Sequence, residues 1–210
     1  PETTVYGVTG PIYFDRDRNA VRQTQFGIYQ YRHLISAPIQ YEPILLPERV
    51  PDLHEQIQKG HVITLDGKYV YATNIIYTGM DIIEIREINP KASTYNVDFY
   101  LWFRYKPKEN DSAFQPENIT FTNGESINDK DIVREEVTAD GSIYKTLRVS
   151  GIFKNQFNYQ AYPFDEQDLI IQFRNQNATA FFIQYVVDRP GMRYSNDKEL
   201  LNYLNKNGAF

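Results

Sequence analysis

The segment 95–105 constrains the fold most, because apolar and polar side chains alternate along it without a break. Successive side chains of a β-strand point to opposite faces, whereas an α-helix would scatter this pattern around its axis. The apolar face carries Val97, Phe99, Leu101, Phe103 and Tyr105, and the other carries Asn96, Asp98, Tyr100, Trp102 and Arg104. This pattern is typical of a sandwich strand whose apolar face is buried against a second sheet.

The rest of the chain after residue 61 also favours strands. Aromatic residues make up 15% of the chain, which suits pleated sheets. Turn signals occur at Asp66-Gly67, Asn123-Gly124 and Asp140-Gly141. Further strands are predicted over 68–74, 79–86, 118–122, 143–153, 167–173 and 180–187. The predicted fold class is all-β: an antiparallel two-sheet immunoglobulin-like sandwich with a few short helices and an N-terminal hairpin extension.

The first sixty residues predict a separate N-terminal part. A polar tip at 16–19 separates two strand-like runs, 10–15 and 24–31, which indicates a hairpin. The prolines in 35–43 permit an edge strand at most. Residues 52–59 predict a short helix between Pro51 and Gly60. We therefore expect a domain boundary here, with 1–60 as strands and connector and 61–210 as the sandwich. A second short helix is predicted over 196–206.

Composition excludes several kinds of function. The net charge of −5 argues against a nucleic-acid partner, which needs a basic face. The absence of cysteine excludes disulfides, thiol nucleophiles and Cys-ligated metals. No stretch reaches the roughly 18 apolar residues of a membrane span. His33, His54 and His61 share no ligand spacing, so we expect scattered, solvated histidines. No catalytic constellation, metal site or cofactor motif is found.

The most informative motif is Tyr162-Pro163-Phe164-Asp165-Glu166-Gln167. It resembles the core of the signature loop of pentameric ligand-gated ion channels, aromatic-Pro-Phe-Asp-x-Gln. In animal members of that family two cysteines enclose thirteen residues, and Asn155 and Leu169 stand at those positions here. The lack of cysteines agrees with the bacterial members.

Three more segments resemble the family in chain order. Residues 95–105 are similar to its second strand, with Tyr105 in the place of a Trp. Residues 116–123 are similar to its Trp-x-Pro-Asp/Glu loop, with Phe114 for the Trp. Residues 141–153 match the strand that leads into the signature loop. The resemblance covers residues of about 75–190.

The resemblance implies a ligand site on the polar face of the second strand. Tyr100, Trp102 and Arg104 occupy positions that line the family's ligand cleft, with Glu117 and Phe121 from the following loop. Aromatic faces can hold a cation, and Arg can fork onto a carboxylate. The alternative is that these side chains only cover the outer face of the sheet.

The signature loop itself implies a structural and coupling role for Tyr162, Pro163, Phe164, Asp165 and Gln167. Pro163 fixes φ, Asp165 can cap backbone amides in a turn, and we expect Phe164 to plug the core. In the family this end of the sandwich faces the membrane.

A second resemblance concerns residues 1–45, which are similar to the C-terminal tail of periplasmic amino-acid-binding proteins. Two functions follow: a sensor of a small ligand in a membrane-anchored receptor, or a structural relay without a ligand of its own. An enzyme is the third and least supported reading. The first ligands to test are amino acids or amines, and a homo-oligomer is compatible with the resemblance. We expect a periplasmic or extracellular location, with any membrane contact made by segments absent from this chain.

Overall fold

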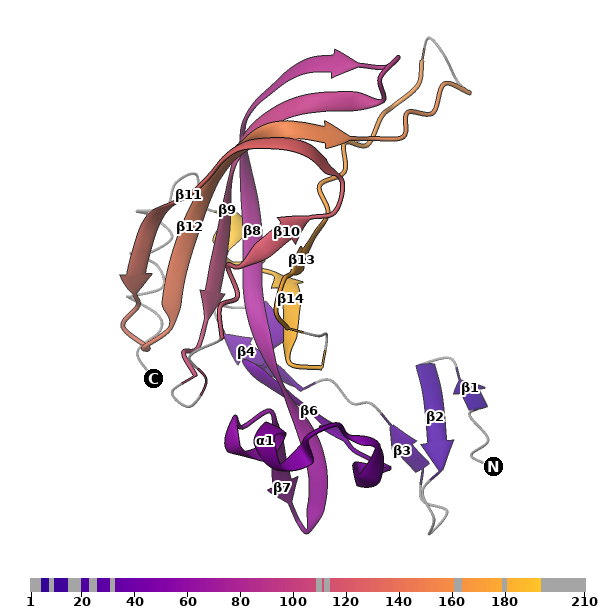
Figure 1. The fold of residues 1–210 in the computed structure, drawn as a ribbon, viewed down its shortest axis with the longest axis vertical. Helices are drawn as coiled ribbons and strands as arrows, with labels where there is room; N and C mark the ends of the chain where they lie inside the picture. The colour runs from indigo at the N-terminus through magenta and orange to yellow at the C-terminus, as the bar shows by residue number, and fades with distance from the viewer. Residues whose placement is uncertain are drawn as a thin grey trace. The chain divides into compact units, whose positions relative to one another are not determined.

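The computed structural model describes residues 5–7, 10–14, 20–22, 26–30, 33–108, 111, 114–160, 164–178 and 181–193. Within these ranges the chain is built mainly of strands (Figure 1). In chain order the elements are β1 (Val5–Gly7), β2 (Gly10–Phe14), β3 (Ala20–Arg22), β4 (Gly27–Gln30), β5 (His33–Ser36), β6 (Ile39–Pro43), η1 (Pro47–Arg49), α1 (Leu53–Gln58), β7 (Val62–Leu65), β8 (Lys68–Asn89), β9 (Thr94–Tyr105), β10 (Ile119–Phe121), β11 (Gly124–Val137), β12 (Ile143–Lys154), β13 (Phe173–Asn175), β14 (Ile183–Val187) and η2 (Gly191–Arg193).

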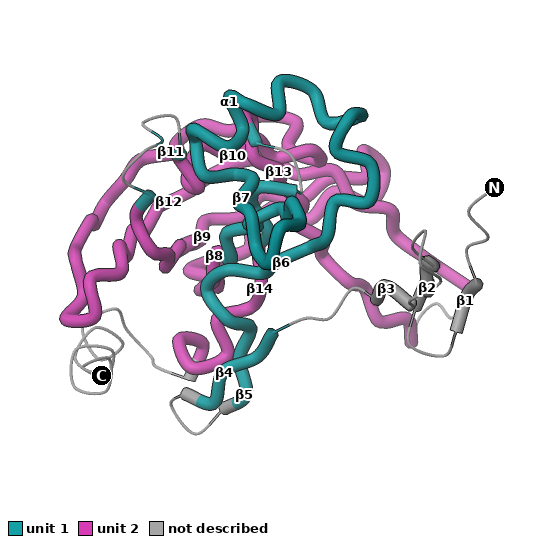
Figure 2. The backbone as a smooth tube through the Cα atoms, turned by 90° about the horizontal axis from the view of Figure 1, so that it is seen from below, with its two compact units in different colours: residues 1–75, 108–114, 178–184 teal, residues 76–107, 115–177, 185–210 magenta. Residues whose placement is uncertain are grey.

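The chain forms two compact units, which Figure 2 shows in different colours. Unit 1 holds residues 1–75, 108–114 and 178–184, and unit 2 holds residues 76–107, 115–177 and 185–210. Because β8 is 22 residues long, it contributes its first part to unit 1 and the remainder to unit 2.

In unit 1, β8 lies between two shorter strands. β6 pairs with it through Tyr41 and Ala72, and β7 pairs with it through Val62 and Tyr71, in both cases antiparallel. The predicted helix over 52–59 is confirmed as α1 (Leu53–Gln58). Gly60 follows it with φ of +65°, a left-handed conformation that glycine adopts at no steric cost.

The predicted N-terminal hairpin is confirmed, with a different second strand. β2 pairs antiparallel with β3, so the strand after the polar tip is Ala20–Arg22. The predicted run 24–31 instead contributes β4, which pairs with β5 in a second hairpin. The helix predicted over 196–206 lies outside the described residues.

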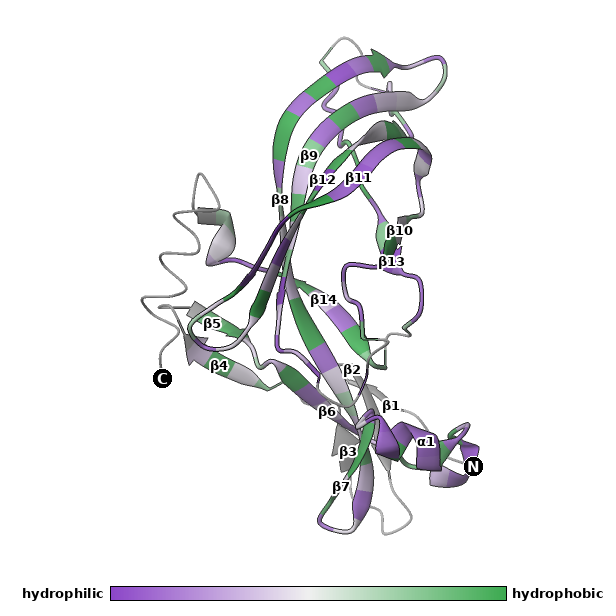
Figure 3. Ribbon diagram, turned by 60° about the vertical axis from the view of Figure 1, so that its left-hand side comes forward, coloured by the Kyte–Doolittle hydropathy of each residue, from purple (hydrophilic) through white to green (hydrophobic). Residues whose placement is uncertain are grey.

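Unit 2 contains the sandwich. Its larger sheet has the order β11-β12-β9-β8-β14, and the first four of these strands run antiparallel side by side (Figure 1). The alternation predicted for 95–105 is confirmed, because Val97, Phe99, Leu101 and Phe103 are each at most 1% exposed. Hydrophobic and hydrophilic bands alternate along β8 and β9 in Figure 3.

The second layer is the antiparallel pair β10–β13. Phe121 from β10 packs edge-to-face on Phe99 and Phe153, with ring centroids 5.9 Å and 5.3 Å apart. Phe173 from β13 packs in the same way on Phe103, at 6.2 Å. Such pairs stabilise a core by about 0.5–1.5 kcal/mol beyond the area that they bury. The predicted two-layer, all-β antiparallel fold is therefore confirmed.

Three predicted strands differ from the structure. The runs 68–74 and 79–86 belong to one strand, β8, and in the region 167–173 only Phe173 is in a strand. The strand β11 was not predicted. β11 is an edge strand with mostly exposed side chains, many of them charged, and three register shifts interrupt its pairing with β12. Edge strands commonly carry such charges and bulges, which hide the alternation from a sequence pattern.

Candidate functional site

The predicted ligand face of β9 is closed by the chain's own residues. Arg104 forks onto Asp188, with Nη2 donating to Oδ1 at 2.8 Å and Nε donating to Oδ2 at 3.2 Å. The side chains are 4% and 0% exposed. The guanidinium carbon also lies 4.2 Å from the ring centre of Tyr77, a cation–π geometry. The carboxylate that binds Arg104 therefore belongs to the protein itself.

Trp102 is buried beside this ion pair, between two glycines. A Cβ added to Gly79 would lie 2.1 Å from Cζ2 of the indole, so only glycine fits under the ring. A Cβ added to Gly191 would lie 2.8 Å from Oδ2 of Asp188 and 3.3 Å from Nε1 of Trp102. Nε1 has no hydrogen-bond partner among the described residues. The indole therefore packs as an internal side chain.

The opposite end of the same face is more open. Tyr100 is partly exposed and lies beside Arg148 of β12 in the sheet register. Arg148 donates to Asp98 at 2.7 Å, and its side chain is 51% exposed. The hydrogen bond from Arg148 lowers the pKa of Asp98. Of the three residues predicted on this face, Tyr100 is the most accessible.

Glu117 and Phe121 do not join that face. Phe121 lies in the core between the layers, as described above. One oxygen of Glu117 accepts a hydrogen bond from Lys145 at 2.6 Å and the other accepts from the Tyr105 hydroxyl at 3.1 Å. Burial, followed by the charge of Glu117, raises the pKa of Tyr105. Trp102 and Arg104 therefore share one environment beside Asp188, whereas Glu117 and Phe121 lie in two others.

The signature loop departs from its prediction at Phe164. Its side chain is 88% exposed, so the expectation that it plugs the core is wrong. Gln167 orders the loop instead, because its Oε1 accepts from the Asn158 amide at 2.9 Å and its Nε2 donates to the Asn158 carbonyl at 2.6 Å. The same Nε2 also donates to Asp165. Tyr162 and Pro163 lie outside the described residues.

The base of the loop is closed by hydrogen bonds around Ile170. Asn155 accepts from the Ile170 amide at 3.1 Å, which links the two ends of the loop. The Ile170 carbonyl accepts from the Tyr95 hydroxyl at 2.8 Å and from Asn123 at 2.6 Å. Asn155 stands where the resembled family has its first cysteine, and that position was the signal in the sequence for this contact.

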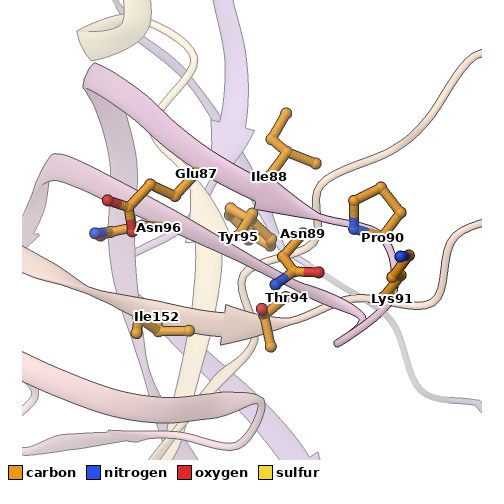
Figure 4. A pocket seen from close by; sticks show the side chains of 9 residues that line it. All are labelled: Glu87, Ile88, Asn89, Pro90, Lys91, Thr94, Tyr95, Asn96 and Ile152. Carbon is orange, nitrogen blue, oxygen red and sulfur yellow. The ribbon is translucent and has the colours of Figure 1, made fainter.

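A cavity of about 710 Å³ lies at the β8–β9 hairpin (Figure 4). The lining residues are Glu87, Ile88, Asn89, Pro90, Lys91, Thr94, Tyr95, Asn96 and Ile152. The Ser93 carbonyl accepts a hydrogen bond from the amide of Asn155 at 2.8 Å, which ties the hairpin to the base of the signature loop. Hairpin and loop therefore form one end of the sandwich.

The prediction of scattered, solvated histidines is wrong for His61, whose side chain is only 12% exposed. Its Nε2 lies 2.8 Å from Oδ2 of Asp111 and its Nδ1 lies 2.9 Å from Oε1 of Gln56. The contact with Asp111 joins residues 50 positions apart in the chain, which no local pattern reveals. His54 lies within hydrogen-bond distance of Gln58, also on α1, and this pair is exposed to solvent.

The described residues contain no group of three or more His, Cys, Asp or Glu side chains that could hold a metal ion. Where the structure is described, no helix is both long and apolar enough to span a membrane.

No protein-family model matches the chain. Among curated proteins, a proton-gated ion channel of Gloeobacter violaceus is 30% identical over 112 residues. The match covers 46% of this chain and 31% of that protein, so the chain spans less than a third of the relative's length. The chain is thus similar to part of a bacterial ion channel.

Proposed function

We propose that this chain is a non-catalytic, extracytoplasmic sensing domain of a membrane-anchored receptor related to ligand-gated channels. The similarity to a proton-gated ion channel and the confirmed all-β sandwich support this proposal. The observation that carries it is the geometry of the signature loop, which is closed at its base and presents Phe164 to solvent.

An ordered loop that exposes a phenylalanine is suited to docking. Tyr159 and Ile170 are each 48% exposed on the same loop, and Ile88 of the β8–β9 hairpin is 52% exposed. Exposed apolar groups gathered at one end of a domain mark interaction sites. We therefore assign this end to contact with membrane-embedded segments of the full receptor, which matches the role that the family resemblance implies.

The closed face of β9 favours a relay as the second candidate function. A ligand that binds Arg104 must first displace Asp188. The carboxylate of Asp188 already accepts two hydrogen bonds from the guanidinium and is fully buried. In the relay, residues 1–60 would belong to an upstream binding module, and the sandwich would transmit its state to the membrane. Calorimetry with amino acids and amines distinguishes the two: a sensor binds, and Trp102→Ala weakens the binding, whereas a relay releases no heat.

The proposed function is tested by a chimera in which this chain replaces the matching extracellular part of the Gloeobacter channel. A step to acidic pH, the stimulus of the proton-gated relative, should evoke current. Phe164→Ala should lower that current by roughly tenfold, the scale of an allosteric coupling of about 1–3 kcal/mol. Ile132→Ala, an exposed apolar residue on β11, is the matched control and should leave the current unchanged. Equal currents from the parent chimera and Phe164→Ala at equal surface expression would refute the proposed docking role.

A further inference from the structure

We propose that the cavity at the β8–β9 hairpin binds a small organic ammonium compound through Glu87 and Asn96. Asn96 lies on the face of β9 that also carries Trp102 and Arg104, but near the other end of the strand. Trp102 and Arg104 are buried, whereas Asn96 lines the cavity. This site is therefore separate from the closed face around Arg104 and independent of the proposed function.

The cavity has the size and the lining of a ligand pocket. Its volume of about 710 Å³ falls within the range of about 300–1,000 Å³ that is typical of small-molecule pockets. The apolar side chains of Ile88, Pro90 and Ile152 form part of its wall. Such a wall holds the apolar body of a ligand, and a few polar groups then decide which ligand binds.

A register shift in β8 brings Glu87 to this cavity. In a regular strand neighbouring side chains point to opposite faces, yet Glu87, Ile88 and Asn89 all line the same cavity. The pairing of β8 with β9 shifts between Arg86 and Asn89, and Glu87 has φ of +50°, which is uncommon for a residue other than glycine. Bulges of this kind occur next to active sites, where they re-aim a side chain. The irregular backbone therefore places a carboxylate at the wall of the cavity.

Two side-chain acceptors at this end of the cavity lack a partner among the described residues. Arg86 lies opposite Asn96 in register, so Glu87 and Asn96 are neighbours on adjacent strands, and Figure 4 draws them together. Oδ1 of Asn96 is shielded from solvent and has no hydrogen-bond partner in the described part of the chain. No ion pair joins the Glu87 carboxylate to another described residue, whereas Arg86 is already paired with Glu84 at 3.3 Å. A buried acceptor without a donor is costly, so a ligand that supplies a donor is favoured.

These acceptors select an ammonium group. An ammonium carries three N–H donors and a positive charge, so it can donate to the Glu87 carboxylate and to Oδ1 of Asn96 together. The terminal amide of Asn96 turns about a soft torsion, which brings Oδ1 to the ligand. Lys91 is the one cationic side chain among the described lining residues, and Figure 4 draws it at the opposite end of the group. The ammonium therefore binds at the Glu87 end, with its apolar body against Ile88 and Ile152.

The test is a titration of the intact chain with isoamylamine at constant pH and ionic strength, followed by nuclear magnetic resonance of the isoleucine methyl groups. The signals of Ile88 and Ile152 should shift until they saturate, whereas Ile132, exposed on β11, should not respond. Isoamyl alcohol has the same apolar body without the charge and should bind more weakly. Glu87→Gln should weaken the binding of the amine by roughly tenfold, the scale of one charge-assisted hydrogen bond.

Asn96→Leu separates a binding role of Asn96 from a structural one. Because Oδ1 of Asn96 has no partner among the described residues, an apolar side chain of similar size should leave the free energy of unfolding unchanged or raise it in urea denaturation. The same substitution should weaken the binding of isoamylamine. The matched control is Glu84→Gln, which removes an exposed carboxylate of the same strand outside the cavity and should leave the affinity unchanged.

Three results would overturn this assignment: methyl signals of Ile88 and Ile152 that do not shift, an alcohol that binds as tightly as the amine, or a Glu87→Gln variant with the affinity of the parent chain. Tighter binding of isovalerate, a carboxylate of similar size, would equally overturn it, because the cavity would then select an anion. Should a variant fail to fold, the comparison of amine, alcohol and carboxylate on the parent chain decides alone. Current through the chimera tests the proposed function separately and does not depend on this site.

Discussion

Two regions of unit 2 contrast sharply: the outer face of β9 and the signature loop. The sequence predicts that Trp102 and Arg104 lie on the outer face of β9, where they either bind a ligand or only cover the sheet, and that Phe164 of the loop is buried. In the structure Trp102 and Arg104 are 5% and 3% exposed, whereas Phe164 is 88% exposed. Arg104 is therefore buried, and Phe164 of the motif is exposed to solvent.

The contrast shows what alternation along a strand can and cannot tell. It assigns side chains to faces, but a face is open only if no other segment covers it. The covering carboxylate, Asp188, lies 84 residues after Arg104 in the chain. A buried charge requires such a partner, so a strand pattern that ends in Arg leaves two readings, and only the fold decides between them.

The largest expected effect is at Asp188. Asp188→Ala leaves the Arg104 guanidinium buried without its carboxylate, which should lower the free energy of unfolding by about 3–5 kcal/mol. Urea denaturation measures this change. As a control, adding Arg104→Met should recover part of the loss, since the unpaired charge is removed with the side chain. A loss below about 1 kcal/mol, the range of exposed pairs, would mean that the outer face is open.

A smaller effect is expected at Gly79, under the indole of Trp102. Gly79→Ala places a methyl group where only 2.1 Å separates it from the ring, and overpacking of this kind costs about 1–3 kcal/mol. Thermal denaturation is the measurement, with exposed Glu84→Ala on the same strand as the control. A variant as stable as the parent would show that the indole is free to move away from β8.

A smaller loss of stability is expected from a substitution at the base of the signature loop. Asn155→Ala removes the acceptor of the Ile170 amide, and a typical intramolecular hydrogen bond contributes about 0.5–1.5 kcal/mol. Urea denaturation should show a loss of that size, and Gln156→Ala, exposed at the next position, should show none. If Asn155→Ala costs nothing, this contact does not close the loop.

The smallest effect is expected at Phe164. Because its ring is exposed, Phe164→Ala should change the free energy of unfolding by no more than about 0.5 kcal/mol. A buried ring at this position would cost about 3–5 kcal/mol. A loss in that range in urea denaturation would show that Phe164 is buried, as the sequence predicts, and would remove the contrast with the outer face of β9.

Strong periodic patterns predicted the fold well. The alternation of 95–105 gave β9 and its buried face, and the segment 143–153 gave β12 almost to the residue. β11 escaped prediction because both of its faces carry charges. The site was harder, because Arg104 and Asp188, or His61 and Asp111, meet only after the chain has folded. Asn155 was noted at a cysteine position of the resembled family, but no role was predicted for it.

The fluorescence of Trp102 tests most directly whether the outer face of β9 is closed. It is the one tryptophan in the sequence, so its emission reports this position alone. The expected result for the folded chain is blue-shifted emission that iodide hardly quenches, with quenching that rises in Asp188→Ala. Emission from the folded parent chain that iodide quenches as readily as in the urea-unfolded chain would contradict the account.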